Sequence, residues 1–162
     1  MTDQQSTPSF GQRGEIYVVV QCLLFALLIF APSHAEFWPW STLPEGMQVF
    51  GTLLMTIGAL VAIAAGIQMG RRLTPLPYPA KDARLLTRGV YTWVRHPMYF
   101  GVIALSIGWA LYVRGALSLG YAAAIVLFFD IKSRREEIWL AQHFEGYAEY
   151  RQRVRKLIPF LY

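Results

Sequence analysis

Arg95, His96 and Pro97 stand together at the start of an apolar run, where they could form a binding site for an anion. Proline lacks a backbone N–H group and suits the first turn of a helix, so Arg95 and His96 are expected at the helix entrance. The free N–H groups and the dipole of such a helix attract a carboxylate. The same residues, taken alone, also fit a positive anchor at a membrane surface.

Glu136, in the charged segment after the last apolar run, is the second candidate. Ser133 and Glu136 fit the S-x-x-E pattern of a capping box, which predicts that a helix begins at Ser133. Glu136 would then head an apolar stripe on that helix, formed by Leu140, Phe144 and Tyr147. The carboxylate could accept hydrogen bonds from a polar ligand group, such as a ribose hydroxyl or an ammonium, or it could only cap the helix.

Two further acidic residues near Glu136 carry different expectations. Glu137 would lie beside it and is expected to be solvated. Asp130 stands at the end of an apolar run, where a buried carboxylate is costly, and is therefore a site candidate. Exposure at the membrane interface would explain Asp130 equally well.

Four apolar runs must position these residues, at about 16–31, 47–69, 97–113 and 115–131. The chain is 55% hydrophobic and only 15% charged, where soluble domains carry about 25% charged residues. Runs of this kind indicate transmembrane helices, although the last two are at the short end for a crossing and could also only dip into the bilayer. We therefore predict an all-α fold in a single domain. It would be an integral membrane helical bundle of about four transmembrane helices plus a cytoplasmic C-terminal helix, with residues 1–13 as a flexible N-terminus.

The distribution of Lys and Arg predicts the orientation of this bundle. Residues 32–45 contain neither, whereas 70–96 and 132–156 are rich in both. Both termini are therefore expected in the cytoplasm. The first apolar run also has some features of a signal peptide followed by a cleavage site, and that alternative stays open.

Together, these motifs resemble the isoprenylcysteine carboxyl methyltransferase and phospholipid methyltransferase superfamily. The resemblance covers about residues 70–160, and the second apolar run matches more loosely. It rests on Tyr91-x-x-x-Arg95-His96-Pro97-x-Tyr99-x-Gly101, on Glu136-Glu137, and on Phe144, Tyr147 and Tyr150. It implies a methyltransferase that uses S-adenosylmethionine at the membrane to methylate a lipidic or small hydrophobic acceptor, through a carboxylate, an amine or a thiol. The short form is similar to bacterial members, which implies a bacterial inner membrane.

The resemblance also assigns roles to individual residues within the segments 74–101 and 130–150. The methyl donor would be held by Ala83, Arg84, Leu85, Leu86, Tyr91, His96, Pro97, Met98, Tyr99 and Glu136. Arg95 and Glu136 are expected to act as orienting charges in catalysis. Lys132 falls where the prenylcysteine enzymes have an arginine that faces the substrate, and it is expected on the acceptor side together with Asp130. Because lysine does not reproduce the bidentate geometry of arginine, this departure puts a prenylcysteine carboxylate in doubt as the acceptor.

Other functions are weighed against this one. A membrane reductase of the sterol-reductase type that uses NADPH, and a membrane scaffold without enzymatic activity, stay open as alternatives. Nucleic-acid binding has no motif in its support, because the basic residues flank apolar runs. The lone cysteine, Cys22, offers no metal site. The small residues Gly51, Gly58 and Gly66 of the second run could mediate a homodimer.

Overall fold

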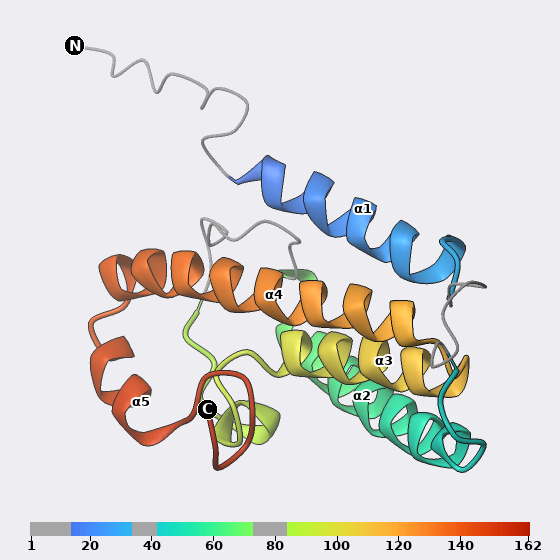
Figure 1. Cartoon of the computed structure of the whole chain (residues 1–162). Helices are drawn as coiled ribbons and strands as arrows, with labels where there is room; N and C mark the ends of the chain where they lie inside the picture. Colours follow the sequence, from blue (N-terminus) through green and yellow to red (C-terminus); the bar gives the residue numbers. More distant parts are fainter. Residues whose placement is uncertain (1–13, 34–41, 73–83) are drawn as a thin grey trace.

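The computed structural model describes residues 14–33, 42–72 and 84–162. Helices are the regular secondary structure of these residues, apart from two isolated β-bridges. These residues form five α-helices (Figure 1). They are α1 (Glu15–Phe30), α2 (Met47–Met69), α3 (Pro97–Tyr112), α4 (Ala116–His143) and α5 (Tyr147–Arg153), with short 3-10 turns η1 (Gly70–Arg72) and η2 (Gly89–Thr92). The all-α prediction is confirmed. The expectations for residues 1–13 and for Ala83 fall outside the described residues.

The first three helices begin and end within one residue of the predicted runs 16–31, 47–69 and 97–113. By length and composition, α2 with 23 residues and α4 with 28 can cross a membrane. The apolar helices α1 and α3 have 16 residues each, or about 24 Å at 1.5 Å per residue, which is less than the hydrocarbon thickness of about 30 Å. Two of the four predicted spans therefore have full crossing length.

The last predicted span does not end at residue 131, and no new helix begins at Ser133. Instead, α4 runs without a break from Ala116 to His143. Ser133 is fully buried in its middle, and its hydroxyl donates to the carbonyl of Asp130 at 2.9 Å. A serine hydroxyl that finds an acceptor in the preceding turn can stay inside a helix. The capping-box prediction was wrong, and Phe144 lies just past the helix, so the predicted stripe is interrupted after Leu140.

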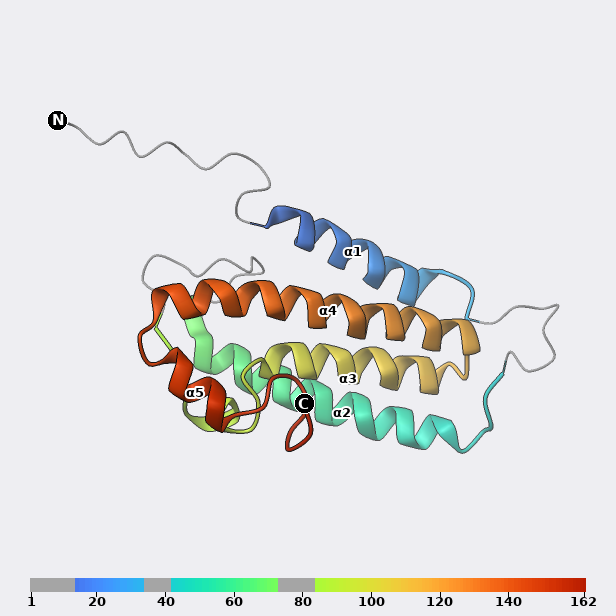
Figure 2. The same cartoon turned by 60° about the vertical axis from the view of Figure 1, so that its left-hand side comes forward.

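The long helices lie side by side, in the order α1, α4, α3, α2 across the bundle (Figures 1 and 2). Glycines bring α2 and α3 into backbone contact: a Cβ atom added to Gly58 would lie 2.6 Å from the carbonyl oxygen of Gly101, and one added to Gly51 would lie 2.6 Å from that of Gly108. Such close approach through small residues is typical of membrane helices. Gly51 and Gly58 therefore pack within this chain, and they do not support the predicted homodimer.

Candidate active site

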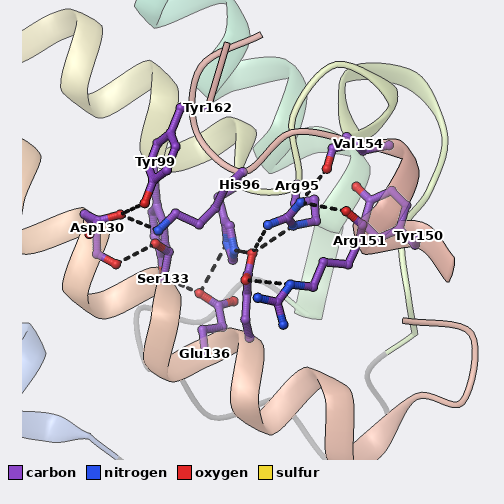
Figure 3. Close-up of polar contacts among 12 residues, drawn as sticks. Arg95, His96, Tyr99, Asp130, Ser133, Glu136, Tyr150, Arg151, Val154 and Tyr162 are labelled. Carbon is purple, nitrogen blue, oxygen red and sulfur yellow. Dashed lines mark hydrogen bonds and ion pairs between the residues drawn. The ribbon is translucent and has the colours of Figure 1, made fainter. Parts of the chain in front are cut away.

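The predicted site residues meet at one end of the bundle, where the start of α3 faces the second half of α4 (Figure 3). Pro97 is the first residue of α3, as predicted, and it places His96 at the N-cap. Tyr99 follows one turn into the helix, and its ring stacks on the His96 ring with the centroids 5.3 Å apart. Glu136 comes from the facing side of α4. Tertiary packing thus joins residues that are about 40 positions apart in the sequence.

Glu136 is the more accessible of two neighbouring carboxylates. The hydroxyl of Tyr99 donates to its Oε2 atom at 2.7 Å, and Nδ1 of His96 lies 3.6 Å from the same oxygen. No described residue forms a hydrogen bond or ion pair with the other oxygen, Oε1, and the side chain is 23% exposed. The carboxylate is held by His96 and Tyr99 and can still accept a hydrogen bond from a ligand.

Glu137 is the residue of the candidate site whose burial the sequence interpretation missed. Instead of being solvated, it is buried, with a side-chain exposure of 6%. Its Oε1 atom lies 2.8 Å from Nε and 2.7 Å from Nη2 of Arg95, and 3.3 Å from Nε2 of His96. Its other oxygen lies 3.7 Å from Arg151. The Glu136-Glu137 pair in the family motif was the available signal, but only the packing of α3 on α4 decides which of the two is buried.

Arg95 is engaged by the protein itself. Besides the ion pair with Glu137, its Nη1 atom donates to the carbonyls of Arg151, at 3.1 Å, and Val154. The backbone N–H of Arg95 also has a protein acceptor, the carbonyl of Arg155 at 2.8 Å. This N–H group is therefore not free for an anion, contrary to the expectation for the helix entrance. The geometry makes Arg95 a residue that orients α4 and the C-terminal segment around the site.

Tyr91 carries a buried hydroxyl group with no hydrogen-bond partner among the described residues. It lies in η2, where Gly89 adopts the left-handed backbone conformation that opens the turn (φ 61°) and Tyr150 donates its hydroxyl to the Tyr91 carbonyl at 2.6 Å. Burial, together with the negative charge of Glu136, raises the pKa of Tyr91 to about 12. The phenol is thus a donor at neutral pH. A buried donor without a partner requires an explanation, and a bound ligand beside Glu136 would provide one.

The remaining predicted donor-site residues lie around this turn. Leu86 and Met98 pack against the buried cluster of Ala65, Val90 and Tyr91. Leu85 is half-buried and Arg84 is exposed, at the start of the segment that leads into η2. The apolar residues therefore line the turn that carries Tyr91. Within the described residues, no group of three or more His, Cys, Asp or Glu side chains could hold a metal ion.

The two residues expected on the acceptor side, Lys132 and Asp130, point in different directions. Two residues along a helix differ by about 200° in direction. Lys132 is buried between α4 and α1, with Nζ 2.7 Å from Oε1 of Gln21 and 5.3 Å from the centroid of the Tyr99 ring. Asp130 instead contacts Lys156 and Tyr162 of the C-terminal segment. The structure brings Lys132 to the site and does not bring Asp130 there.

Comparison with known proteins decides the family. The phospholipid methyltransferase family model matches residues 47–146, more than half of the chain. The chain belongs to this family. The match runs from the start of α2 to just before α5, so it includes Tyr91, Arg95, His96, Tyr99 and Glu136 and leaves out the C-terminal segment. The resemblance inferred from the motifs is confirmed.

Individual relatives within this methyltransferase family are isoprenylcysteine enzymes. The chain is 33% identical over 129 residues to the protein-S-isoprenylcysteine O-methyltransferase of Homo sapiens, covering 77% of this chain and 45% of the human protein. It is 31% identical over 140 residues to protein-S-isoprenylcysteine O-methyltransferase B of Arabidopsis thaliana, covering 84% of this chain and 68% of that protein. The chain thus spans a little under half the length of the human relative.

The structure is similar to that of the eukaryotic intramembrane Ras methyltransferase ICMT (isoprenylcysteine carboxyl methyltransferase). The TM-score is 0.63 at 25% sequence identity, over 96% of this chain and 55% of that one. This likeness to an intramembrane family member agrees with the two helices of crossing length and identifies the chain as an integral membrane protein.

Proposed function

We propose that this protein is a methyltransferase that takes its methyl group from S-adenosylmethionine and transfers it to a lipidic acceptor at the membrane. Family membership supports the reaction type. The observation that carries the proposal is the pair formed by Tyr91 and Glu136. The Tyr91 hydroxyl is buried without a hydrogen-bond partner among the described residues, and it lies within the electrostatic influence of Glu136, a partly exposed carboxylate with one oxygen that no described residue binds. A small polar ligand that offers both a donor and an acceptor would satisfy the two groups.

The residues of the site fit the polar groups of S-adenosylmethionine, whose sulfonium supplies an activated methyl group. Oε1 of Glu136 can accept a hydrogen bond from an ammonium or a ribose hydroxyl, and the Tyr91 phenol can donate one. Tyr99 and His96 hold the Glu136 carboxylate in place. The ion pair of Arg95 with Glu137, the residue next to Glu136, holds the start of α3 against α4. The contribution of this site is positioning, because a fixed alignment of reactants can lower the barrier by up to about 7–11 kcal/mol.

The acceptor is proposed to approach between α1 and α4. Lys132 and Gln21 meet there, beside the Tyr99 ring. Apolar and aromatic side chains surround this point, with Tyr17 packed on Phe128 and Phe25 on Phe129. A hydrophobic acceptor could thus reach the site from the bilayer while its polar end meets Lys132. Because the relatives are isoprenylcysteine O-methyltransferases, an isoprenylcysteine carboxylate is one candidate acceptor.

Ligand binding by purified protein in detergent tests the proposal, measured by calorimetry with S-adenosylmethionine and its demethylated product. The native protein is expected to bind both saturably. Glu136→Gln should weaken binding about tenfold or more, since hydrogen bonds to charged groups contribute about 1.5–3 kcal/mol. The matched control is Glu145→Gln, which removes an exposed carboxylate outside the site and should leave binding unchanged.

The neighbouring carboxylate gives a contrasting variant. Glu137→Gln removes one partner of a buried ion pair, which typically costs about 3–5 kcal/mol of stability, so its melting temperature should fall well below that of Glu136→Gln. A folded native protein that binds neither ligand would overturn the proposed function, and NADPH would be the next ligand to test. Native-like affinity in Glu136→Gln would remove Glu136 from the site.

A further inference from the structure

The C-terminal tail, residues 154–162, closes the entrance of α3. Val94 and Arg155 form an isolated parallel bridge. The backbone N–H of Arg95 donates to the carbonyl of Arg155 at 2.8 Å, and that of His96 donates to the carbonyl of Lys156 at 3.1 Å. Arg95 and His96, two of the side chains that contact Glu136 and Glu137, are therefore carried by backbone whose N–H groups depend on the tail for their acceptors.

A partly buried charge pair holds this tail against α4. The ammonium of Lys156 contacts the carboxylate of Asp130, with side-chain exposures of 8% and 18%. Asp130 also accepts a hydrogen bond from the Tyr162 hydroxyl at 2.9 Å and one from Nε of Arg134 at 2.8 Å. The ammonium lies 4.7 Å from the centroid of the Tyr162 ring. Oδ1 of Asp130 thus holds the end of the chain against α4, while Oδ2 pairs with Arg134 of α4 itself.

The charge pair and the ligand-facing carboxylate share one rigid element. Asp130 and Glu136 are six residues apart on α4, or about 9 Å along its axis. The tail spans from Asp130 to the backbone of residues 94–96, and the side chains of Arg95 and His96 return from there to Glu137 and Glu136. Contacts therefore run from α4 through the tail to residues 95 and 96 and back to α4. Together they set the position of His96 relative to Glu136.

We propose that Lys156 is a positioning residue for the methyl-donor site. Its pairing with Asp130 holds the tail in the register that places Arg95 and His96 against the two glutamates. Lys156 contacts the site only through this backbone and takes no part in the chemistry. The segment lies beyond the residues that the family model matches, so the inference rests on the contacts of this chain. It also rests on the proposed function, because the site it supports is the one assigned to S-adenosylmethionine.

The decisive variant is Lys156→Met, which keeps the aliphatic stem and removes the charge. We expect its dissociation constant for the demethylated cofactor product to rise about tenfold, equivalent to about 1.4 kcal/mol. Lys156→Arg should keep an affinity near the native value, because it keeps the positive charge that Lys156→Met removes. The matched control is Arg155→Met, which removes the same charge from an exposed neighbour and leaves the carbonyl that receives the Arg95 N–H. It should bind like the native protein.

A second control separates positioning from general loss of stability. Ile125→Val trims a residue that is 1% exposed and belongs to a buried cluster of α1, α3 and α4 that contains no tail residue. It should lower the melting temperature without changing the dissociation constant. The double variant Asp130→Asn/Lys156→Met should bind no more weakly than Lys156→Met alone, because both substitutions break the same pair. Should Lys156→Met fail to fold, Asp130→Asn breaks the pair from the other side and is expected to show the same loss of affinity.

Two results would overturn the proposal. One is native affinity in Lys156→Met, and the other is an equal loss of affinity in Ile125→Val at a matched decrease in melting temperature. Failure of the proposed function would appear differently, as absence of binding by the native protein itself. In that case hydrogen exchange decides: the amides of residues 95 and 96 should exchange faster in Lys156→Met than in Arg155→Met, and equal rates would refute the positioning role.

Discussion

Glu136 and Glu137 are adjacent, yet α4 directs their side chains about 100° apart, so that they meet different surroundings. Glu137 lies against the guanidinium of Arg95, where each charge compensates the desolvation of the other. Among the described residues, the polar partners of Glu136 are the Tyr99 hydroxyl and Nδ1 of His96, and its side chain retains some exposure to solvent. The same side chain therefore serves structure at one position and is available to a ligand at the next.

Tyr91→Phe tests whether the unpartnered hydroxyl belongs to a ligand. Since the hydroxyl has no hydrogen bond among the described residues, its removal should leave the melting temperature unchanged or slightly raised. Affinity for the demethylated cofactor product should nevertheless fall about threefold to tenfold, as expected for a hydrogen bond worth about 0.5–1.5 kcal/mol. The loss should be the same at pH 7 and pH 9, because burial and the charge of Glu136 keep the phenol protonated up to about pH 12.

Tyr150→Phe is the control for this tyrosine variant. Its hydroxyl has a buried protein acceptor, the Tyr91 carbonyl, so its removal should lower the melting temperature. A pattern in which Tyr91→Phe destabilises the protein and leaves ligand affinity intact would contradict the assignment of Tyr91 to the ligand.

At the scale of single residues, the sequence was informative where a residue type is rare for its place. Arg95 and His96 stand at the edge of an apolar run, and the structure brings them to Glu136 and Glu137 of the charged segment. The burial of Glu137 could not be anticipated, because it depends on contacts with residues more than 40 positions away. Asp130 was singled out for the cost of burying its charge, and that cost is offset by Lys156 and Arg134. A charged residue that is costly to bury therefore indicates that an oppositely charged partner is near. The location of that partner decides whether the residue belongs to the candidate site.

Among the helices, the interface of α2 with α3 depends on the absence of side chains. A Cβ atom on Gly101 would lie 2.6 Å from the Gly58 carbonyl oxygen, and one on Gly58 would lie equally close to the Gly101 carbonyl oxygen. Backbone atoms cannot yield as a flexible side chain can, so the two helices would have to separate. Because α3 carries Tyr99 and follows His96, a shift of this interface would also reach the site.

Gly58→Ala is therefore expected to destabilise the protein by about 1–3 kcal/mol, the usual range for overpacking. Gly120→Ala is the matched control, because a Cβ at this position on α4 meets no atom within 4 Å and alanine favours a helix. Thermal unfolding in detergent should show a lower melting temperature for the first variant and an equal or higher one for the second. Equal stability of both variants would mean that α2 and α3 do not approach as closely as the structure shows.

The lengths of the apolar runs predicted the bounds of α1, α2 and α3. In a membrane, a long uncharged run must satisfy its backbone hydrogen bonds internally, and a helix does this. The prediction for α4 was wrong because it gave a local capping pattern priority. The Ser133 hydroxyl instead bonds the Asp130 carbonyl in the preceding turn, and Asp130 pairs with Arg134 across one helical turn. These contacts within one turn keep α4 continuous. The capping hydrogen bonds predicted for a new helix at Ser133 do not form.

In the whole molecule, the candidate site and most basic residues share one end of the bundle. Arg95 and Arg151 contact Glu137 in the site (Figure 3). Arg134 and Lys156 pair with Asp130 one to two turns away on α4. Arg114, at the α3–α4 turn, donates to the Leu43 carbonyl and pairs with Glu45 at the opposite end. Because basic residues collect on the cytoplasmic side of membrane proteins, the site should face the cytoplasm.

Cysteine accessibility tests this orientation. On a Cys22→Ala background, Glu45→Cys and Glu149→Cys place single thiols at the two ends, each replacing an exposed acid. A membrane-impermeant maleimide added to intact cells should label the Glu45→Cys variant at once. The Glu149→Cys variant should be labelled only after the membrane is permeabilised, because α5 lies at the basic end. The reverse pattern would put the candidate site outside the cell and away from cytoplasmic S-adenosylmethionine, and it would contradict the orientation together with the proposed source of the methyl group.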